Sequence, residues 1–253
     1  MSKVSNPFLS IPRPVADARL RLFCFPHAGG AASLFRLWHT GLPASVEVCG
    51  VQLPGREARW REEVFTDVDT LLGVLVPALA PLLDLPFALF GHSMGAVLAF
   101  ELARELRRRG MPAPLHLFLS GHRAPQTPEG RFNIHQLPDA EFLEQIVMRY
   151  DGIPKIILEE PELLRIYLRA LRADFALLET YPYRAEPPLG CPLSVVNSLD
   201  DPSVTLEELV AWREQTEDFF RLELLPGAHF YFHKDPAQLL RSLARDLAPL
   251  VGG

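Results

Sequence analysis

The pentapeptide Gly91-His92-Ser93-Met94-Gly95 fits the pattern Gly-x-Ser-x-Gly, in which the serine can act as a nucleophile. This chemistry needs a serine on a very tight turn between a strand and a helix, and small residues two positions away on either side. The pentapeptide follows the apolar run Phe87–Phe90 and precedes a helical pattern that starts near Met94. An ordinary helix-capping serine is the weaker interpretation. We therefore predict that Ser93 is a nucleophile.

A nucleophilic serine needs a general base, and the sequence offers several histidines for this role. Those after Ser93 are His116, His122, His135, His229 and His233. His229 lies in Pro226-Gly227-Ala228-His229-Phe230, directly after the last predicted strand, so we predict it as the base, with His233 as the alternative. His116 falls within a predicted strand and is expected to be structural. His92 is expected to shape the turn, because adjacent side chains diverge.

The acid that orients the base should lie between Ser93 and His229 in the chain, because the order with this serine turn is Ser, Asp or Glu, then His. Asp200-Asp201-Pro202 follows the strand candidate Leu193–Asn197. Either aspartate could orient the imidazole. The same three residues are also an ordinary start signal for a helix. The residues alone do not separate Asp200 from Asp201.

Two N–H donors are needed for the oxygen that becomes negatively charged when a carbonyl is attacked. The first predicted donor is the backbone N–H of Met94, which follows the nucleophile at a helix amino end. The second is the N–H of Ala28, in the small-residue loop Pro26-His27-Ala28-Gly29-Gly30 after an early strand. A phosphate site is a weak alternative, because Gly-x-Gly-x-x-Gly and a Gly-Lys-Ser/Thr ending are both absent from the sequence.

The elements that must position these residues alternate between apolar strand-like runs and helical patterns. Continuous hydrophobicity indicates strands covered on both faces, as in a mostly parallel sheet. Helices such as Met94–Arg109, closed by Gly110, lie between them. This alternation predicts an α/β fold, a doubly wound sheet with flanking helices. The strand candidates are Leu20–Phe25, Val46–Gln52, Phe87–Phe90, Leu115–Ser120, Leu193–Asn197 and Phe220–Leu224.

One stretch, from about 136 to 181, interrupts the alternation with helical patterns over Ala140–Tyr150 and Glu160–Glu179. We expect a helical insertion that forms a lid over the active site, within a single domain of residues 1–253. Packing of these helices on the flank of the sheet is the alternative. Apolar lid residues either line the entry path or pack between helices. They are Phe142, Ile146, Ile153, Ile157 and Leu163.

Composition excludes several other classes. A formal charge of −6 and a pI near 5.8 give no reason to expect nucleic-acid binding. Three separated cysteines have no zinc or redox spacing, and the N-terminus shows no secretory signal. The apolar stretch Leu71–Phe90 contains Asp84 and three prolines, so we expect a helix, a turn and a buried strand rather than a membrane span. A reduced, cytoplasmic protein is expected.

From about Leu20 to Leu247 the chain resembles the type II (editing) thioesterases associated with polyketide and nonribosomal peptide synthetases, which have an α/β-hydrolase fold. In that family the catalytic Asp generally precedes Pro or a similar turn residue, so the resemblance favours Asp201 over Asp200. It implies the triad Ser93, Asp201 and His229. The segments that carry it are Phe25-Pro26-His27-Ala28-Gly29-Gly30, Gln52-Leu53-Pro54-Gly55-Arg56-Glu57, Phe90 to Ala96, Leu171-Arg172-Ala173-Asp174-Phe175, Asp200-Asp201-Pro202 with Trp212-Arg213, and Pro226 to Phe230.

The resemblance also implies an activity and a partner. The expected reaction is hydrolysis of acyl or aminoacyl thioesters from the phosphopantetheine arm of an acyl or peptidyl carrier protein, without metal or organic cofactor. No nucleic-acid or membrane partner is expected, and the chain is expected to be a monomer. A chain-releasing thioesterase, a carboxylesterase or lipase, and an inactive binding partner of a synthase are the alternatives. The free-standing length, with its own Met1 and no carrier domain, favours editing over chain release.

Overall fold

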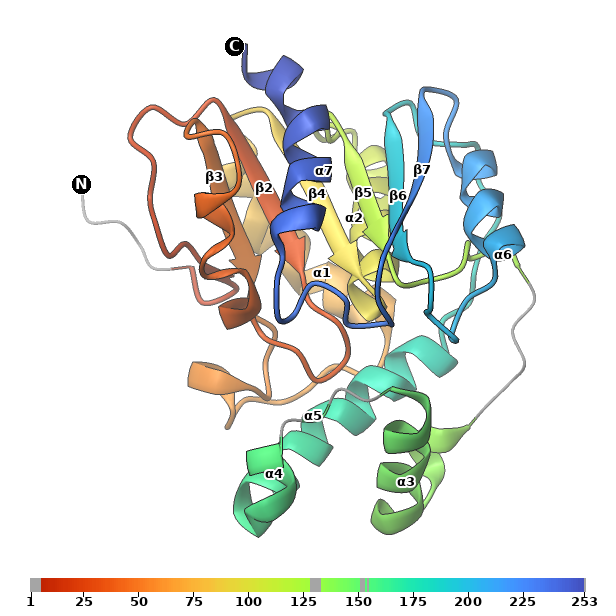
Figure 1. Cartoon of the computed structure of the whole chain (residues 1–253). Helices are drawn as coiled ribbons and strands as arrows, with labels where there is room; N and C mark the ends of the chain where they lie inside the picture. The colour runs from red at the N-terminus through yellow and green to blue at the C-terminus, as the bar shows by residue number, and fades with distance from the viewer. Residues whose placement is uncertain (1–5, 128–132, 151–152, 154, 253) are drawn as a thin grey trace.

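A seven-stranded sheet forms the centre of the computed structural model, which describes residues 6–127, 133–150, 153 and 155–252 (Figure 1). The strand order is β1-β3-β2-β4-β5-β6-β7. Only the edge pair β1–β3 is antiparallel, and the other neighbours are parallel. The strands are β1 (Leu9–Ser10), β2 (Leu20–Phe25), β3 (Val46–Val51), β4 (Phe87–His92), β5 (Leu117–Ser120), β6 (Leu193–Ser198) and β7 (Phe220–Leu225). The predicted α/β class and all six predicted strands are confirmed, with ends shifted by at most two residues. Strand β1 was not predicted.

Continuous apolar runs form these strands because helices cover both faces of the sheet. Strands β3, β4, β5 and β6 are buried along their whole length. Helices α1 (Val68–Leu79) and α2 (Met94–Arg108) pack on one face, where Leu75 and Leu98 lie in the same core as Phe23. Helix α7 (Ala237–Leu247) covers the opposite face in the front of Figure 1. The sheet is therefore a rigid platform for the loops at its carboxyl edge.

The apolar stretch Leu71–Phe90 divides as expected into most of α1, a single 3₁₀ turn (Ala80–Leu82) and most of β4. Asp67 caps α1 by accepting a hydrogen bond from the backbone N–H of Thr70. Gly110, with φ of +63°, follows the end of α2 as the predicted cap. Within the described residues, no helix combines the length and apolar character needed to cross a membrane.

Three helices lie beyond the carboxyl ends of the strands, below the sheet in Figure 1. They are α3 (Asp139–Arg149), α4 (Lys155–Glu159) and α5 (Pro161–Glu179), and the 3₁₀ turn Ile134–Gln136 precedes them. Both predicted helices of this segment are confirmed, whereas the five-residue α4 was not predicted. Residues 151, 152 and 154 of the expected lid lie outside the described part of the chain. Apart from these, the segment contains no strand, so the alternation of strands and helices is interrupted here.

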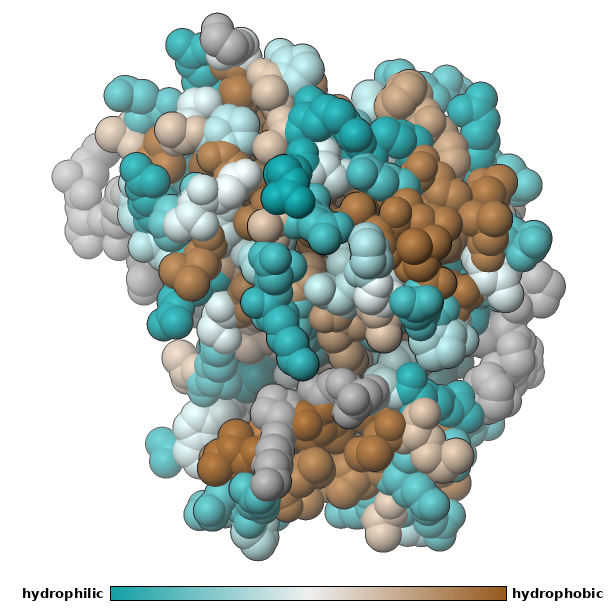
Figure 2. All heavy atoms as spheres, in the orientation of Figure 1, coloured by the Kyte–Doolittle hydropathy of each residue, from teal (hydrophilic) through white to brown (hydrophobic). Residues whose placement is uncertain are grey.

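Helices α3 and α5 and the preceding 3₁₀ turn share a small core, in which the Phe142 and Phe175 rings pack edge to face 5.7 Å apart. Apolar side chains also gather on the outside of this region, as Figure 2 shows. The exposed ones are Val147, Met148, Ile156, Leu158 and Leu163. The helices therefore form a small body with an apolar inside and a partly apolar outside. The short helix α6 (Leu206–Val210) precedes β7 in the chain and lies away from this body in Figure 1.

Candidate active site

Ser93 occupies the turn between β4 and α2, with backbone angles φ 55° and ψ −118°. This left-handed conformation is strained for a residue other than glycine. A Cβ on Gly91 would lie 1.9 Å from the carbonyl oxygen of Gly95, and a Cβ on Gly95 would lie 2.1 Å from the carbonyl oxygen of Phe25. Both glycines of the pentapeptide are thus required by backbone contacts. The Ser93 N–H donates to the carbonyl of Ser120 at 2.7 Å, which fixes the turn to β5.

His229 and Asp201 form a hydrogen-bonded pair at the same edge of the sheet. The Nδ1 atom of His229 lies 2.9 Å from Oδ2 of Asp201, and both residues are buried. Burial alone would raise the pKa of Asp201, but hydrogen bonds from His229 and Ser203 outweigh it and hold the pKa below its usual value. The carboxylate is therefore ionised and accepts from Nδ1, so that in the neutral ring Nε2 carries the lone pair. An imidazole in this state can accept a proton from a hydroxyl group.

Asp200 and His233 do not share this arrangement. Asp200 is exposed, and its backbone N–H donates to the carbonyl of Gly227. The His233 ring lies 4.9 Å from the ring of His27 and 4.7 Å from that of Phe230, and burial lowers its pKa to about 4. Of the described histidines, only His229 is hydrogen-bonded to Asp201.

His92 and His116 are both buried histidines with serine partners. Nδ1 of His92 lies 3.0 Å from Oγ of Ser120, and its ring lies against that of His229 at 4.9 Å. Burial lowers the pKa of His92 well below its usual value. Nε2 of His116 lies 2.8 Å from Oγ of Ser194, away from the turn. His92 is therefore neutral and packs against the ring of His229, which is consistent with a role in shaping the turn.

Ser203 is a contributor that the sequence analysis missed. Its hydroxyl donates to Oδ1 of Asp201 at 2.6 Å, and its backbone N–H donates to the same oxygen at 2.9 Å. The Ser203 oxygen also lies 3.1 Å from Nδ1 of His229. The aspartate therefore accepts hydrogen bonds on both oxygens and is held in one orientation. A signal was available, since Asp-x-Ser is a pattern that forms a local turn through the aspartate side chain.

Loop 26–32, between β2 and the first 3₁₀ turn, carries Ala28 and is held by three polar contacts. The Gly29 N–H donates to Oδ2 of Asp174 at 2.7 Å. Nη1 of Arg56 donates to the Gly30 carbonyl at 3.0 Å, and the Ala32 N–H donates to Oε1 of Gln52 at 3.1 Å. No role was predicted for Asp174, Arg56 or Gln52 from the sequence, although the segments that contain them carried the family resemblance. Their contacts fix the backbone beside Ala28.

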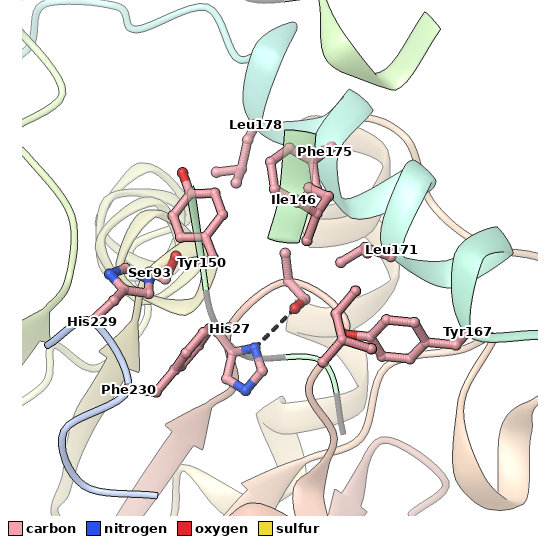
Figure 3. A pocket seen from close by; sticks show the side chains of 12 residues that line it. His27, Ser93, Ile146, Tyr150, Tyr167, Leu171, Phe175, Leu178, His229 and Phe230 are labelled. Carbon is pink, nitrogen blue, oxygen red and sulfur yellow. Dashed lines mark hydrogen bonds between the residues drawn. The ribbon is translucent and has the colours of Figure 1, made fainter. Parts of the chain in front are cut away.

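A pocket lies beside Ser93 and His229. Its lining is mostly apolar and comes from loop 26–32, the turn at Ser93, the loop after β7, helices α3 and α5, and the residues that follow α3, as Figure 3 shows. Of the five expected lid residues, Ile146 and Ile153 line this pocket, Phe142 packs inside the helical body, Ile157 is half-buried outside the pocket lining, and Leu163 is exposed. The lining residues are His27, Ala28, Ser93, Ile146, Tyr150, Ile153, Tyr167, Leu171, Phe175, Leu178, His229 and Phe230.

The cavity is narrow. Its volume of about 30 Å³ is room for one or two water molecules. The Tyr150 ring lies 5.1 Å from that of His229, and burial raises the pKa of the Tyr167 phenol to about 12. Among the described residues, no acidic or basic side chain other than the histidines lines the pocket. The cavity therefore suits a small, uncharged group beside the Ser93 hydroxyl. In the described part of the chain, no three His, Cys, Asp or Glu residues are placed to hold a metal ion.

Comparisons with known proteins place this arrangement in a family. Residues 20–247 match the family described as thioesterase domain. The chain is 42% identical over 249 residues to linear gramicidin dehydrogenase LgrE of Brevibacillus parabrevis, covering 97% of this chain and 94% of that one. It is 41% identical to the RedJ thioesterase from the prodiginine biosynthetic pathway of Streptomyces coelicolor, with 96% of each chain covered and a TM-score of 0.85. The type II thioesterase BorB from the borrelidin biosynthetic cluster has 35% identity, coverage of 96% and 97%, and a TM-score of 0.84. The chain therefore belongs to the thioesterase family, and its mostly parallel sheet with flanking helices is the α/β-hydrolase fold.

Proposed function

We propose that this thioesterase releases acyl and aminoacyl groups from the phosphopantetheine arm of a carrier protein, and thereby removes stalled or aberrant chains during polyketide or nonribosomal peptide synthesis. The observation that carries the proposal is the hydrogen-bonded pair His229–Asp201 beside Ser93 in one narrow apolar pocket. The names of the relatives support the biosynthetic setting, since they refer to gramicidin, prodiginine and borrelidin.

The proposed reaction begins with attack of Ser93 Oγ on the thioester carbonyl carbon, while Nε2 of His229 takes the hydroxyl proton. The backbone N–H groups of Ala28 and Met94 donate to the resulting oxyanion. When the intermediate collapses, the carbon–sulfur bond breaks, and His229 returns the proton to the sulfur, so that pantetheine leaves as the thiol. Asp201 stabilises the imidazolium that forms between these two steps.

The second half of the reaction releases the acid. A water molecule attacks the carbonyl carbon of the acyl-serine ester, and its proton moves to Nε2 of His229. Collapse of this second intermediate breaks the bond to Ser93 Oγ, which takes the proton back from His229. The free carboxylic acid leaves, and the enzyme returns to its starting state.

The helices α3 to α5 are proposed to act as the lid of this pocket. A cavity of about 30 Å³ is too small for an acyl group with its pantetheine arm, so part of the lining must move to admit the substrate. Ile146, Tyr150 and Ile153 bring the segment around α3 to the pocket. We propose further that the chain acts as a monomer, which light scattering of the purified protein tests.

The deciding experiment compares turnover of an acyl-carrier-protein thioester with turnover of an oxygen ester of the same acyl group. We expect the thioester to be preferred and the free acid to be the product. Preference for the oxygen ester would identify an esterase, and a cyclised product would identify a chain-releasing thioesterase. The name of the relative LgrE raises a dehydrogenase as a further candidate, but this chain lacks Gly-x-Gly-x-x-Gly. Hydrolysis without a nicotinamide cofactor would exclude it.

A further inference from the structure

Asp174 belongs to helix α5 but directs its carboxylate at loop 26–32. Oδ2 accepts from the Gly29 N–H at 2.7 Å and from Nη1 of Arg56 at 2.8 Å, while Oδ1 accepts from Nη2 of Arg56 at 2.8 Å. Asp174 is 3% exposed and Arg56 is 7% exposed. A buried bidentate ion pair of this kind is geometrically specific. It joins three segments that are far apart in the sequence.

The same face of α5 forms a wall of the pocket. Tyr167, Leu171, Asp174 and Leu178 are spaced by four, three and four residues, which places them on one side of a helix. The three neighbours of Asp174 in this set line the pocket, as Figure 3 shows for their side chains. The stripe therefore contains three residues that contact the cavity and one that holds the loop next to it.

Loop 26–32 packs closely against this stripe at Gly29. A Cβ on Gly29, whose φ is +74°, would lie 2.6 Å from the Tyr167 hydroxyl oxygen and 2.9 Å from Cδ1 of Leu171. The Gly29 backbone therefore packs against the ends of these two side chains. If the loop and α5 separated, the Arg56 guanidinium would be buried without its counter-ion, which is strongly unfavourable. The loop and α5 are therefore held together by the contacts of Asp174 and by packing at Gly29.

We propose that Asp174 is a positioning residue for catalysis. Its carboxylate, together with Arg56, joins α5 and loop 26–32 into one unit and holds the backbone N–H of Ala28, one residue before Gly29, where the oxyanion accepts from it. The inference rests on the proposed function, which assigns the Ala28 N–H to the oxyanion.

The test uses Asp174→Ala and Asp174→Asn in the full chain, with p-nitrophenyl acetate as the substrate. Hydrolysis of this ester needs the oxyanion donors but no carrier protein. For Asp174→Ala we expect kcat to fall by about 10- to 100-fold, since loss of an oxyanion donor outright costs about 10²–10³, with KM changed by less than about threefold. Asp174→Asn keeps an oxygen that can accept from the Gly29 N–H. Its kcat is expected to lie between those of Asp174→Ala and the wild type.

Glu101→Gln is the matched control. Glu101 forms another buried ion pair, with Arg104 at 2.5 Å on α2. Loss of this ion pair should lower stability as well, while kcat of the folded protein stays within about twofold.

Wild-type kcat in folded Asp174→Ala would overturn the inference, as would an equal fall in kcat in Glu101→Gln. If Asp174→Ala does not fold, Asp174→Asn decides: wild-type kcat in that variant overturns the inference, and a selective fall supports it. If the wild type hydrolyses p-nitrophenyl acetate but no acyl-carrier thioester, the proposed function fails and the role of Asp174 still stands.

Discussion

Two clusters in this enzyme contain a serine, a histidine and an aspartate, and they lie at opposite ends of the sheet. Ser93, Asp201 and His229 follow the carboxyl ends of β4, β6 and β7. His116 and Ser194 lie instead at the amino ends of β5 and β6, and Asp246 of α7 completes that cluster. The residue types are the same, yet only the first cluster borders the apolar pocket.

The order of the hydrogen bonds separates the two clusters. In the first, His229 donates to Asp201, so the free nitrogen of the ring is available to a hydroxyl. In the second, the serine lies in the middle: Ser194 Oγ donates to Asp246 at 2.8 Å and accepts from Nε2 of His116. The Ser194 proton is thus directed to a carboxylate that already pairs with Arg221. Residue type alone does not make a nucleophile; position and hydrogen-bond direction do.

The largest expected difference is in kcat, between the variants Ser93→Ala and Ser194→Ala. Ser93→Ala should lower kcat by roughly 10⁴- to 10⁶-fold without unfolding the protein. His229→Ala should lower kcat by a similar factor, because loss of one member of a catalytic unit costs nearly as much as loss of several. Ser194→Ala should keep kcat within about twofold but reduce the free energy of unfolding by about 1–3 kcal/mol, since His116 and Asp246 lose a buried partner. Steady-state kinetics and urea unfolding measure the two effects. Comparable loss of kcat in both variants would remove the distinction between the clusters.

A smaller effect on activity should separate the two neighbouring aspartates. Asp201→Asn is expected to lower kcat by roughly 10²- to 10⁴-fold, because an amide no longer stabilises the imidazolium or fixes its tautomer. Asp200→Asn should stay within about twofold, since Asp200 faces solvent. Asp246→Asn serves as the control from the second cluster and should change stability rather than kcat. A larger fall in kcat in Asp200→Asn than in Asp201→Asn would identify Asp200 as the acid of the triad.

The smallest predicted effect is a change in the pH dependence of stability, and it arises from His116 in the second cluster. Burial lowers the pKa of His116 from 6.5 to about 4 in the folded protein. The unfolded chain therefore binds the additional proton between about pH 6.5 and 4, so stability is complete above pH 6.5 and falls as the pH drops. From pH 7 to pH 4.5 this histidine should account for about 2–3 kcal/mol. Urea unfolding of His116→Gln should show a correspondingly weaker pH dependence, and an unchanged dependence would contradict this origin.

The sheet could be predicted from the sequence because its strands are long apolar runs with helices on both sides. Strand β1 is only two residues long, and α4 only five, so neither has enough residues to show a period. Ser93 and His229 could be singled out because their neighbours and their order in the chain are informative. The choice between Asp200 and Asp201 could not be made from the residues themselves, since both precede the same turn. The structure distinguishes them by burial.

The pair Arg56–Asp174 shows where prediction from one sequence stops. The two residues are separated by 118 positions, and neither stands in a pattern that requires a partner. A charged residue within a helix is normally exposed, and only the packing of α5 against loop 26–32 buries this one. The family resemblance included both segments without saying that they meet. Contacts of this kind depend on the tertiary fold and not on local sequence.

At the turn of Ser93, stability and activity oppose each other. A non-glycine residue with this positive φ destabilises the folded state by about 1–3 kcal/mol, whereas glycine would adopt the same angles without strain. Replacement of Ser93 by glycine would therefore favour folding and at the same time eliminate the hydroxyl. In a lineage that no longer needed the reaction, this serine would be among the first residues to drift. Its presence in a strained turn is thus a sign that the chain has been kept for turnover rather than for binding alone.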